Sequence, residues 1–206
     1  MGILVAEKGL VNYHLNVNKK RKRERHMKKI GFFVGSLRKD SYTLKVAKKL
    51  NELLPEGFEG ELVEIRDLPH YNEDLEANVP ETWANFRDKV KGFDGFFFLT
   101  PEYNRTFPSA LKNALDVGSR PYGASVWGQK PAAVVSVSPG AIGGFGANHH
   151  LRQALVFLDV PVMAQPEAYI GGVMQTIDEN GVHAESLLGF LQVIVDAYVE
   201  FFTHFA

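Results

Sequence analysis

The chain has 206 residues, of which 23 are Lys or Arg and 24 are Asp or Glu, and it contains no Cys. This length is typical of one domain with a sizeable core, and the lack of Cys excludes disulfides, a thiolate nucleophile and a cysteine-bound zinc site. A reducing compartment fits this composition, so we expect a cytoplasmic protein. No apolar run approaches the roughly 18 residues of a membrane span, and we expect no membrane association.

The first 26 residues differ in composition from the rest and include the basic run KKRKRER (19–25). They lack a signal peptide's order of basic start, apolar core and small-residue cleavage site. They hold seven Lys and Arg against two Asp and Glu, which leaves the remaining chain with a formal charge of −6. Acidic domains bind polyanions poorly, so a nucleic-acid or nuclear-targeting role is the weaker alternative. We expect residues 1–26 to be a disordered or non-native leader, residues 27–206 to form the domain, and no nucleic-acid partner.

Short apolar runs alternate with segments of helical periodicity along residues 27–206. In chain order, the pattern predicts strand 28–34, helix 44–54, strand 60–68, helix 80–90, strand 94–100, helix 109–118 with Gly118 as its cap, strand 131–137, helix 148–160, strand 161–166 and helix 184–202. Strands that are apolar throughout are buried on both faces. The alternation therefore predicts an α/β fold with a parallel sheet covered by helices on both sides.

Three polar loops follow strands of this sheet. They are GSLRKDSYT (35–43, the first loop), TPEYNRTFPSALKNA (100–114, the second loop) and SVSPGAIGGFGAN (136–148, the third loop). In parallel sheets, ligands bind beyond the carboxyl ends of the strands, near the point where the strand order reverses. The three loops are therefore expected to build one binding site.

The first loop has the composition of an anion site. It leads directly into a helix, whose free N–H groups and dipole favour a negative charge. Ser36, Ser41 and Thr43 offer hydroxyl groups, and Arg38 offers a guanidinium suited to phosphate oxygens. Alternatively, Asp40 or Ser41 merely caps the helix. Capping accounts for one of these residues, so the loop predicts a phosphate site.

Other phosphate, hydrolase and metal motifs fit the chain poorly. The Walker pattern and the G-x-S-x-G elbow are absent. GFGANH (144–149) has His149 where a dinucleotide motif needs its third Gly, and it follows a late strand. His149 and His150 are adjacent, so they would point to different faces of a helix. We expect no metal site.

The second and third loops are suited to a flat aromatic ligand. PEYN (101–104) combines a rigid Pro, an aromatic ring and several backbone polar groups. SPGAIGG (138–144) allows close approach of the backbone, because glycine carries no side chain. Either loop alone could be an ordinary turn. Together with a phosphate loop, they outline a mononucleotide with a large ring.

These motifs, with HLRQALVFLDVPVMAQPE (150–167), resemble the NAD(P)H-dependent FMN reductase family, which includes quinone, chromate and azo reductases. The resemblance covers about Lys28 to Gly172. It implies a flavodoxin-like three-layer sandwich with a five-stranded parallel sheet in order 2-1-3-4-5, a bound FMN, NAD(P)H as co-substrate, and a homodimer or homotetramer.

The resemblance also implies the cofactor-binding residues. The FMN phosphate would bind to the first loop, through Ser36, Arg38, Ser41, Tyr42 and Thr43. The isoalloxazine would lie between two sets of residues, namely Pro101, Glu102, Tyr103 and Asn104 on one side and Ser138, Gly140 and Gly143 on the other. The family usually has Asn at the position of Thr43, and relatives often carry Arg or a longer polar side chain within residues 145–150.

The implied chemistry belongs to the cofactor, so no catalytic side chain is expected. Electrons would pass from NAD(P)H through FMN to quinones, free flavin, azo compounds or chromate, with the two substrates using one open flavin face in turn by a ping-pong mechanism. A flavodoxin-type one-electron carrier is the alternative, although its phosphate loop usually lacks an Arg such as Arg38. A nucleotide-binding module without flavin is a second alternative.

Overall fold

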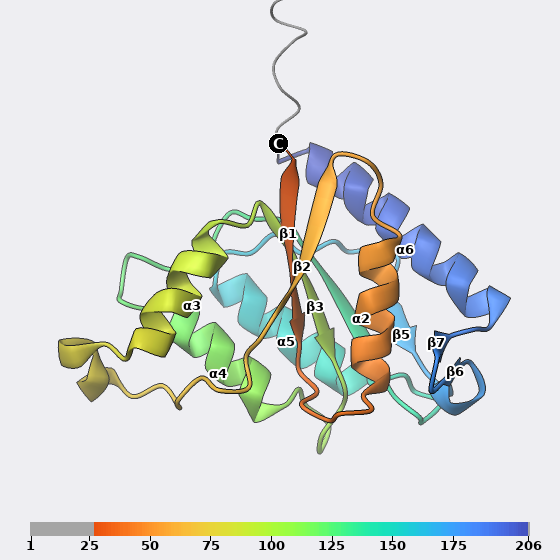
Figure 1. Cartoon of the computed structure of the whole chain (residues 1–206), viewed down its shortest axis with the longest axis horizontal. Coiled ribbons are helices and arrows are strands. Elements are labelled where there is room, and N and C mark those ends of the chain that lie inside the picture. Colours follow the sequence, from red (N-terminus) through yellow and green to blue (C-terminus); the bar gives the residue numbers. More distant parts are fainter. Residues whose placement is uncertain (1–26, 206) are drawn as a thin grey trace, which may run out of the picture.

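The structure is a computed structural model that describes residues 27–205. Its main sheet has five parallel strands in the order β2-β1-β3-β4-β5 (Figure 1). The strands are β1 (Lys28–Val34), β2 (Phe58–Val63), β3 (Gly95–Thr100), β4 (Ala132–Val137) and β5 (Ala168–Ile170). This order confirms the expected flavodoxin-like topology. The proposed leader, residues 1–26, lies outside the described residues, so the domain boundary stays a prediction.

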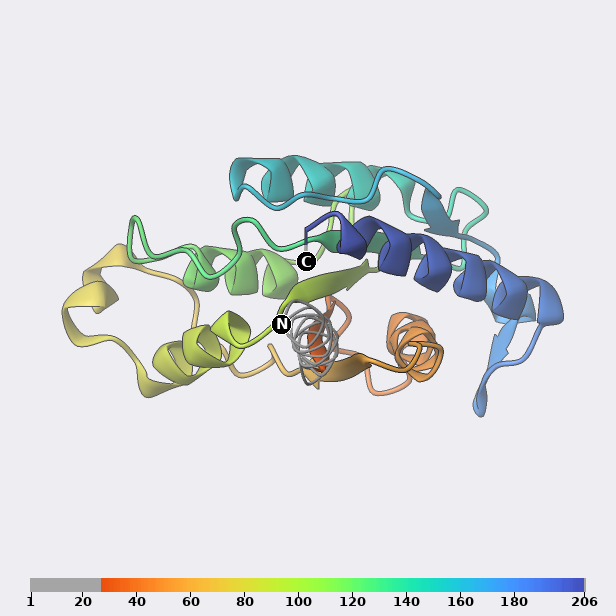
Figure 2. The ribbon, with the colours of Figure 1, turned by 90° about the horizontal axis from the view of Figure 1, so that it is seen from above.

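Helices cover both faces of the sheet, as the view along the strands shows (Figure 2). One face packs against α2 (Tyr42–Glu52) and α6 (Glu185–Thr203). The other packs against α3 (Glu81–Lys91), α4 (Ser109–Gly118) and α5 (Phe145–Phe157). The smaller elements are the 3₁₀ helices η1 (Glu73–Asn78) and η2 (Val173–Gln175) and the hairpin of β6 (Ile177–Asp178) with β7 (Gly181–Val182).

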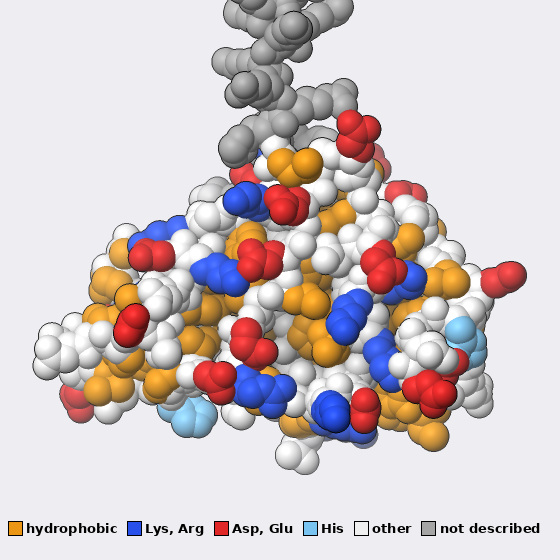
Figure 3. All heavy atoms as spheres, in the orientation of Figure 1, with side chains coloured by type: hydrophobic (Ala, Val, Ile, Leu, Met, Phe, Trp, Pro, Cys, Tyr) orange, Lys and Arg blue, Asp and Glu red, His pale blue; other side chains and the backbone are white. Residues whose placement is uncertain are grey.

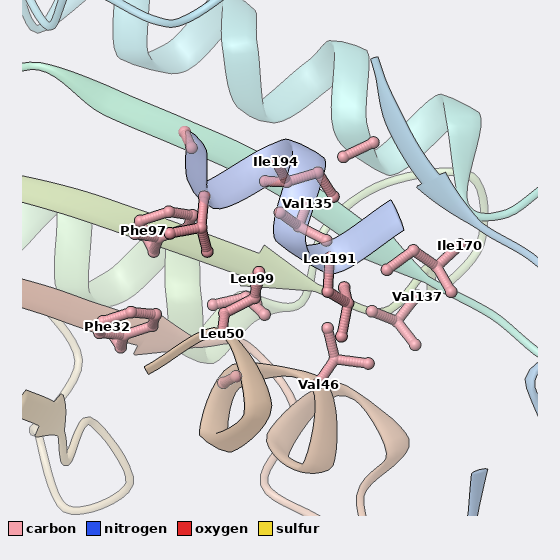
Figure 4. Packing of buried hydrophobic residues seen from close by; sticks show 14 of the residues in the cluster. Phe32, Val46, Leu50, Phe97, Leu99, Val135, Val137, Ile170, Leu191 and Ile194 are labelled. Carbon is pink, nitrogen blue, oxygen red and sulfur yellow. The ribbon is translucent and has the colours of Figure 1, made fainter. Parts of the chain in front are cut away.

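Side chains along the central strands point alternately to the two faces of the sheet, which divides the core into two halves. Phe32, Phe97 and Leu99 point toward α2 and α6, where Leu50 and Leu191 complete the packing (Figure 4). Their neighbours Phe33, Phe96 and Phe98 point to the opposite face and surround the buried Trp127. Because both faces of each strand are buried, these runs contain almost no polar residue.

Several element boundaries differ from the sequence expectation, three of them substantially. The fifth strand lies at 168–170 rather than 161–166, where Val162 makes only an isolated bridge to Ala132. Pro161 and Pro166 lack the N–H that a continuing ladder needs, so pairing cannot extend there. The second strand ends at Val63 rather than at 68, and α5 begins three residues earlier than predicted.

Helix α6 is more apolar than the sequence analysis recognised. It spans 19 residues, and an 18-residue window of it has a mean hydropathy of 1.4, which is long and apolar enough to cross a membrane by length and composition alone. One side of it, with Leu191, Ile194 and Tyr198, is fully buried against the sheet. Burial against the sheet accounts for this side of α6, while 33% of the apolar window as a whole is buried.

Candidate functional site

The three loops singled out in the sequence leave the sheet at the same edge and the same level. Val34 lies opposite Leu99, and Thr100 lies opposite Ser136, so β1, β3 and β4 end side by side. In Figure 1 their carboxyl ends and the loops lie at the lower edge of the sheet. The strand order reverses between β1 and β3, which is where ligands of such sheets bind.

The first loop provides a set of free backbone donors. Gly35 N–H still donates to Leu99 O at 2.8 Å, and donation resumes at Leu44, whose N–H reaches Ser41 Oγ at 3.1 Å. Between them, none of the N–H groups of residues 36–43 makes a well-aligned hydrogen bond to another described residue, and residues 39–40 form a turn. A loop of free N–H groups ahead of a helix is a site that fits a phosphate dianion.

Side chains of the first loop divide into buried and exposed groups. Ser41 is 2% exposed and is the N-cap of α2, so the capping interpretation is right for this residue. Its hydroxyl hydrogen remains available to a phosphate oxygen. Thr43 is equally buried, Ser36 and Tyr42 are half-buried, and Arg38 is exposed. Arg38 is therefore free to turn its charge toward a ligand.

The second loop is a tight turn with unusual backbone angles. Tyr103 and Thr106 exchange two backbone hydrogen bonds of 2.9 and 3.0 Å. The two residues between them, Asn104 and Arg105, have φ values of 50° and 66°. Left-handed backbone at a non-glycine residue is costly and persists where the surroundings enforce it. The turn therefore holds the half-exposed Tyr103 ring and its neighbouring polar groups at the sheet edge.

Glu102 makes structural contacts besides the place beside the ring that its motif predicted. Its side chain, 12% exposed, accepts a hydrogen bond from Ala147 N–H at 3.1 Å and pairs with Arg105 at 3.0 Å. Ala147 lies in the first turn of α5, where a carboxylate is favoured by free N–H groups and the helix dipole. Glu102 thus ties the second loop to α5, whereas Pro101, also half-buried, begins the loop.

The third loop depends on two glycines with left-handed backbone. Gly143 and Gly144 have φ values of 66° and 76°, and a Cβ on Gly143 would lie 2.6 Å from the Tyr169 carbonyl carbon. The buried Ser136 hydroxyl donates to Gly143 O at 2.7 Å and accepts from Asn148 at 3.3 Å. These hydrogen bonds hold the third loop against the end of β4.

The outer part of the third loop is closed by its own backbone. Ser138 Oγ accepts from Gly140 N–H at 3.1 Å, and Gly140 O accepts from Gly143 N–H at 3.1 Å. Gly140 itself is exposed, so its backbone can approach a planar ligand closely.

His149 belongs to an aromatic cluster beside this loop. Its Nε2 lies 2.9 Å from the Tyr169 hydroxyl, which also donates to Glu167 at 2.9 Å. Burial and the hydrogen bond to Glu167 raise the pKa of Tyr169, so it stays a neutral donor at physiological pH. Among the described residues, no group of three or more His, Cys, Asp or Glu side chains is placed to hold a metal.

Two residues around the site were missed by the sequence analysis. Asn148 was predicted only as the junction between the third loop and the helix 148–160, yet it is fully buried and donates to Ser136. Arg66 was assigned to a strand, yet its guanidinium donates to Leu37 O in the first loop at 2.9 Å. Because these partners lie far apart in the sequence, no motif with a fixed spacing could identify them. The position of Asn148 next to a glycine-rich loop was the available indication in the sequence.

The fold and the free N–H groups of the first loop define a flavodoxin-like protein whose sheet edge can hold a mononucleotide. A sequence profile of the family described as NADPH-dependent FMN reductase matches residues 28–175. The chain belongs to this family. Its cofactor is FMN, its electron donor is NAD(P)H, and it is an oxidoreductase.

Individual relatives cover most of the chain. A quinone reductase of Pseudomonas putida is 57% identical over 170 residues, which span 82% of this chain and 91% of the relative. A 2-hydroxy-1,4-benzoquinone reductase of Burkholderia sp. is 44% identical over 82% of this chain and 93% of its own length. The solved structure of FerB, a flavoenzyme NAD(P)H:(acceptor) oxidoreductase from Paracoccus denitrificans, has a TM-score of 0.81 and 41% identity, and the match covers 86% of this chain and 98% of FerB.

Proposed function

We propose that this protein is a quinone reductase that binds FMN in the site formed by the three loops. The observation that carries the proposal is the run of free N–H groups at residues 36–43 beside two glycine- and proline-rich loops. The relatives named as quinone reductases support the choice of acceptor. Free flavin, azo compounds and chromate are further acceptors that the same open site would admit.

Each loop has a separate task in this proposal. Backbone N–H groups of the first loop, with the hydroxyls of Ser36, Ser41 and Thr43 and the charge of Arg38, hold the phosphate, and Tyr42 begins the helix behind them. On one side of the ring lie Pro101, Glu102, Tyr103 and Asn104, and on the other lie Ser138, Gly140 and Gly143. The bound FMN supplies the hydride-accepting chemistry, while the chain binds it, orients it and leaves one face open.

The proposal also covers kinetics, assembly and location. NAD(P)H and quinone use the same open face in turn, which is a ping-pong mechanism. The protein acts in the cytoplasm as a homodimer or homotetramer. Arg38 and the quinone reductase relatives favour this enzyme over a one-electron carrier of the flavodoxin type.

Purified protein provides the test. The full chain should show flavin absorption bands, either as isolated or after reconstitution with FMN. Once unbound FMN and oxygen are removed, it should sustain NADPH oxidation only when 1,4-benzoquinone is present. A matched reaction without protein controls for direct reduction of the quinone. A colourless protein that FMN does not reconstitute would contradict the FMN site, and flavin binding without quinone-dependent oxidation would contradict the choice of acceptor.

A further inference from the structure

Arg66 connects two loops that belong to neighbouring strands. It follows β2, and its Nη2 donates to Leu37 O at 2.9 Å across a separation of 29 residues. Leu37 lies within the first loop, whose free N–H groups are proposed to hold the FMN phosphate. The side chain of Arg66 therefore acts directly on the backbone of the phosphate site.

The hydrogen bond from Arg66 orients the Leu37 carbonyl and, with it, a neighbouring N–H donor. The Leu37 carbonyl and the Arg38 N–H belong to one planar trans peptide, so the two groups point in opposite directions. When Arg66 holds the carbonyl, the orientation of the Arg38 N–H is fixed too. That N–H is one of the free donors of residues 36–43. A loop with preset donors loses less conformational entropy on binding an anion.

The surroundings of Arg66 are positively charged. A cavity of about 260 Å³ lies between the ends of β1 and β2, and its lining includes Ser36, Arg38, Lys48, Glu64 and Arg66. The single carboxylate already accepts the N–H groups of Ile65 and Arg66, at 3.0 and 2.8 Å. Figure 3 shows Lys and Arg side chains, with carboxylates between them, over α2 and the loop at its lower end. Three cations and one carboxylate therefore line this cavity, and Asp40 is a further carboxylate within the first loop.

We infer that Arg66 is a positioning residue for the phosphate of FMN, which it serves by fixing the Leu37 carbonyl and by adding positive charge next to Arg38. This inference rests on the proposed function, because it assumes that the phosphate binds to the first loop. It assigns a task to a residue outside the motifs of that loop. It also predicts an effect confined to ligands that carry a phosphate.

Comparison of FMN with riboflavin isolates the phosphate, because riboflavin has the same ring without it. The full chain, freed of flavin, is titrated with each ligand by fluorescence quenching. Arg66→Ala should raise the Kd of FMN by about three- to tenfold, as expected for one partly solvated charge-assisted hydrogen bond, and should leave the Kd of riboflavin within about twofold. Arg66→Lys keeps the charge without the planar donor geometry, so its loss should be smaller.

Two further variants make the outcome unambiguous. Lys91→Ala removes an exposed cation from α3, where it pairs with Asp88, and should leave both ligands unaffected. Arg38→Ala should weaken FMN selectively if the phosphate binds to the first loop. If Arg66→Ala leaves both Kd values unchanged, as Lys91→Ala should, or raises both equally, the positioning role of Arg66 is wrong while the phosphate site stands. If Arg38→Ala also fails to discriminate between the ligands, the proposed phosphate site is wrong.

Discussion

Arg38 is exposed in the first loop, and it is separated from the core that holds β1 in place. Replacing it with Ala should therefore leave the fold intact while weakening the binding of FMN. A charge-assisted hydrogen bond contributes about 1.5–3 kcal/mol, so the Kd of FMN should rise roughly ten- to hundredfold. Titration of the flavin-free protein with FMN measures this change, and Lys91→Ala, which removes an exposed cation of α3, is the control. Unchanged affinity would assign the phosphate to another part of the molecule.

Glu102 differs from Arg38, because its side chain also makes a structural contact with α5. Glu102→Ala leaves the Ala147 N–H without its acceptor and frees the second loop from α5. The free energy of unfolding should fall by about 1–2 kcal/mol, in the range of helix-capping losses. Glu102→Gln keeps an oxygen acceptor and should lose less than half of that amount.

Urea unfolding of the flavin-free protein measures both variants of Glu102. Arg105→Ala is the control, because Arg105 is 75% exposed and its pairing with Glu102 should contribute little. Equal destabilisation by Glu102→Ala and Arg105→Ala would mean that the ion pair, rather than the contact with α5, holds the second loop.

At the scale of elements, two glycines within helices differ in the space that surrounds them. Gly118 was predicted to cap α4, but it is the last helical residue, and Ser119 has ordinary helical backbone. A Cβ on Gly118 would lie 2.5 Å from Nε1 of the fully buried Trp127. Gly189 in α6 has nothing within 4 Å of the position where its Cβ would be.

The same substitution should therefore have opposite effects in the two helices. Gly118→Ala forces the Trp127 ring to move and should lower the free energy of unfolding by about 1–3 kcal/mol. Gly189→Ala adds no clash and should raise it by about 0.5–1 kcal/mol, the usual gain for Ala over Gly within a helix. Thermal or urea unfolding compares the two variants with the parent. Stabilisation by Gly118→Ala would show that Trp127 has room to move.

The same elements show what the sequence could and could not predict. The central strands were predictable because β1, β3 and β4 are buried on both faces and read as apolar runs. The fifth strand has three residues, too few for any period, so the neighbouring segment 161–166 was assigned in its place. The early start of α5 depends on Gly144 in left-handed backbone, which a sequence pattern does not reveal.

The candidate site was predictable to a similar degree. The loops could be located because carboxyl ends of parallel strands meet at one edge. The partners of Glu102 and Arg66 could not, since Ala147 lies 45 residues from Glu102 and Leu37 lies 29 residues from Arg66. Contacts of this kind arise only once the sheet has brought its loops together.

For the whole molecule, the described core begins at β1, and Lys28 pairs with Phe58 in its first register position. A chain that starts at Met27 should therefore keep the melting temperature and the FMN content of the full chain. Differential scanning fluorimetry and the ratio of flavin to protein absorbance measure these two properties. A chain that starts at Gly31 is the control, because it loses residues that pair with β2 and should melt lower. A lower melting temperature on removing residues 1–26 alone would show that they contribute to the domain.

Turnover tests the proposal that both substrates use a single open face. The partial dinucleotide motif at 144–149 has glycines with structural roles. Gly144 is the N-cap of α5, and a Cβ on Gly146 would lie 2.7 Å from Arg105 O. Residues 27–205 then contain no glycine-rich motif for a separate dinucleotide site, so oxidised nicotinamide should have to leave before a quinone enters. Initial rates measured against NADPH at several fixed concentrations of 1,4-benzoquinone should therefore give parallel lines in double-reciprocal plots, the pattern of a stored intermediate. Intersecting lines would mean that both substrates bind together. A paramagnetic signal that persists during stepwise reduction would instead favour the one-electron carrier.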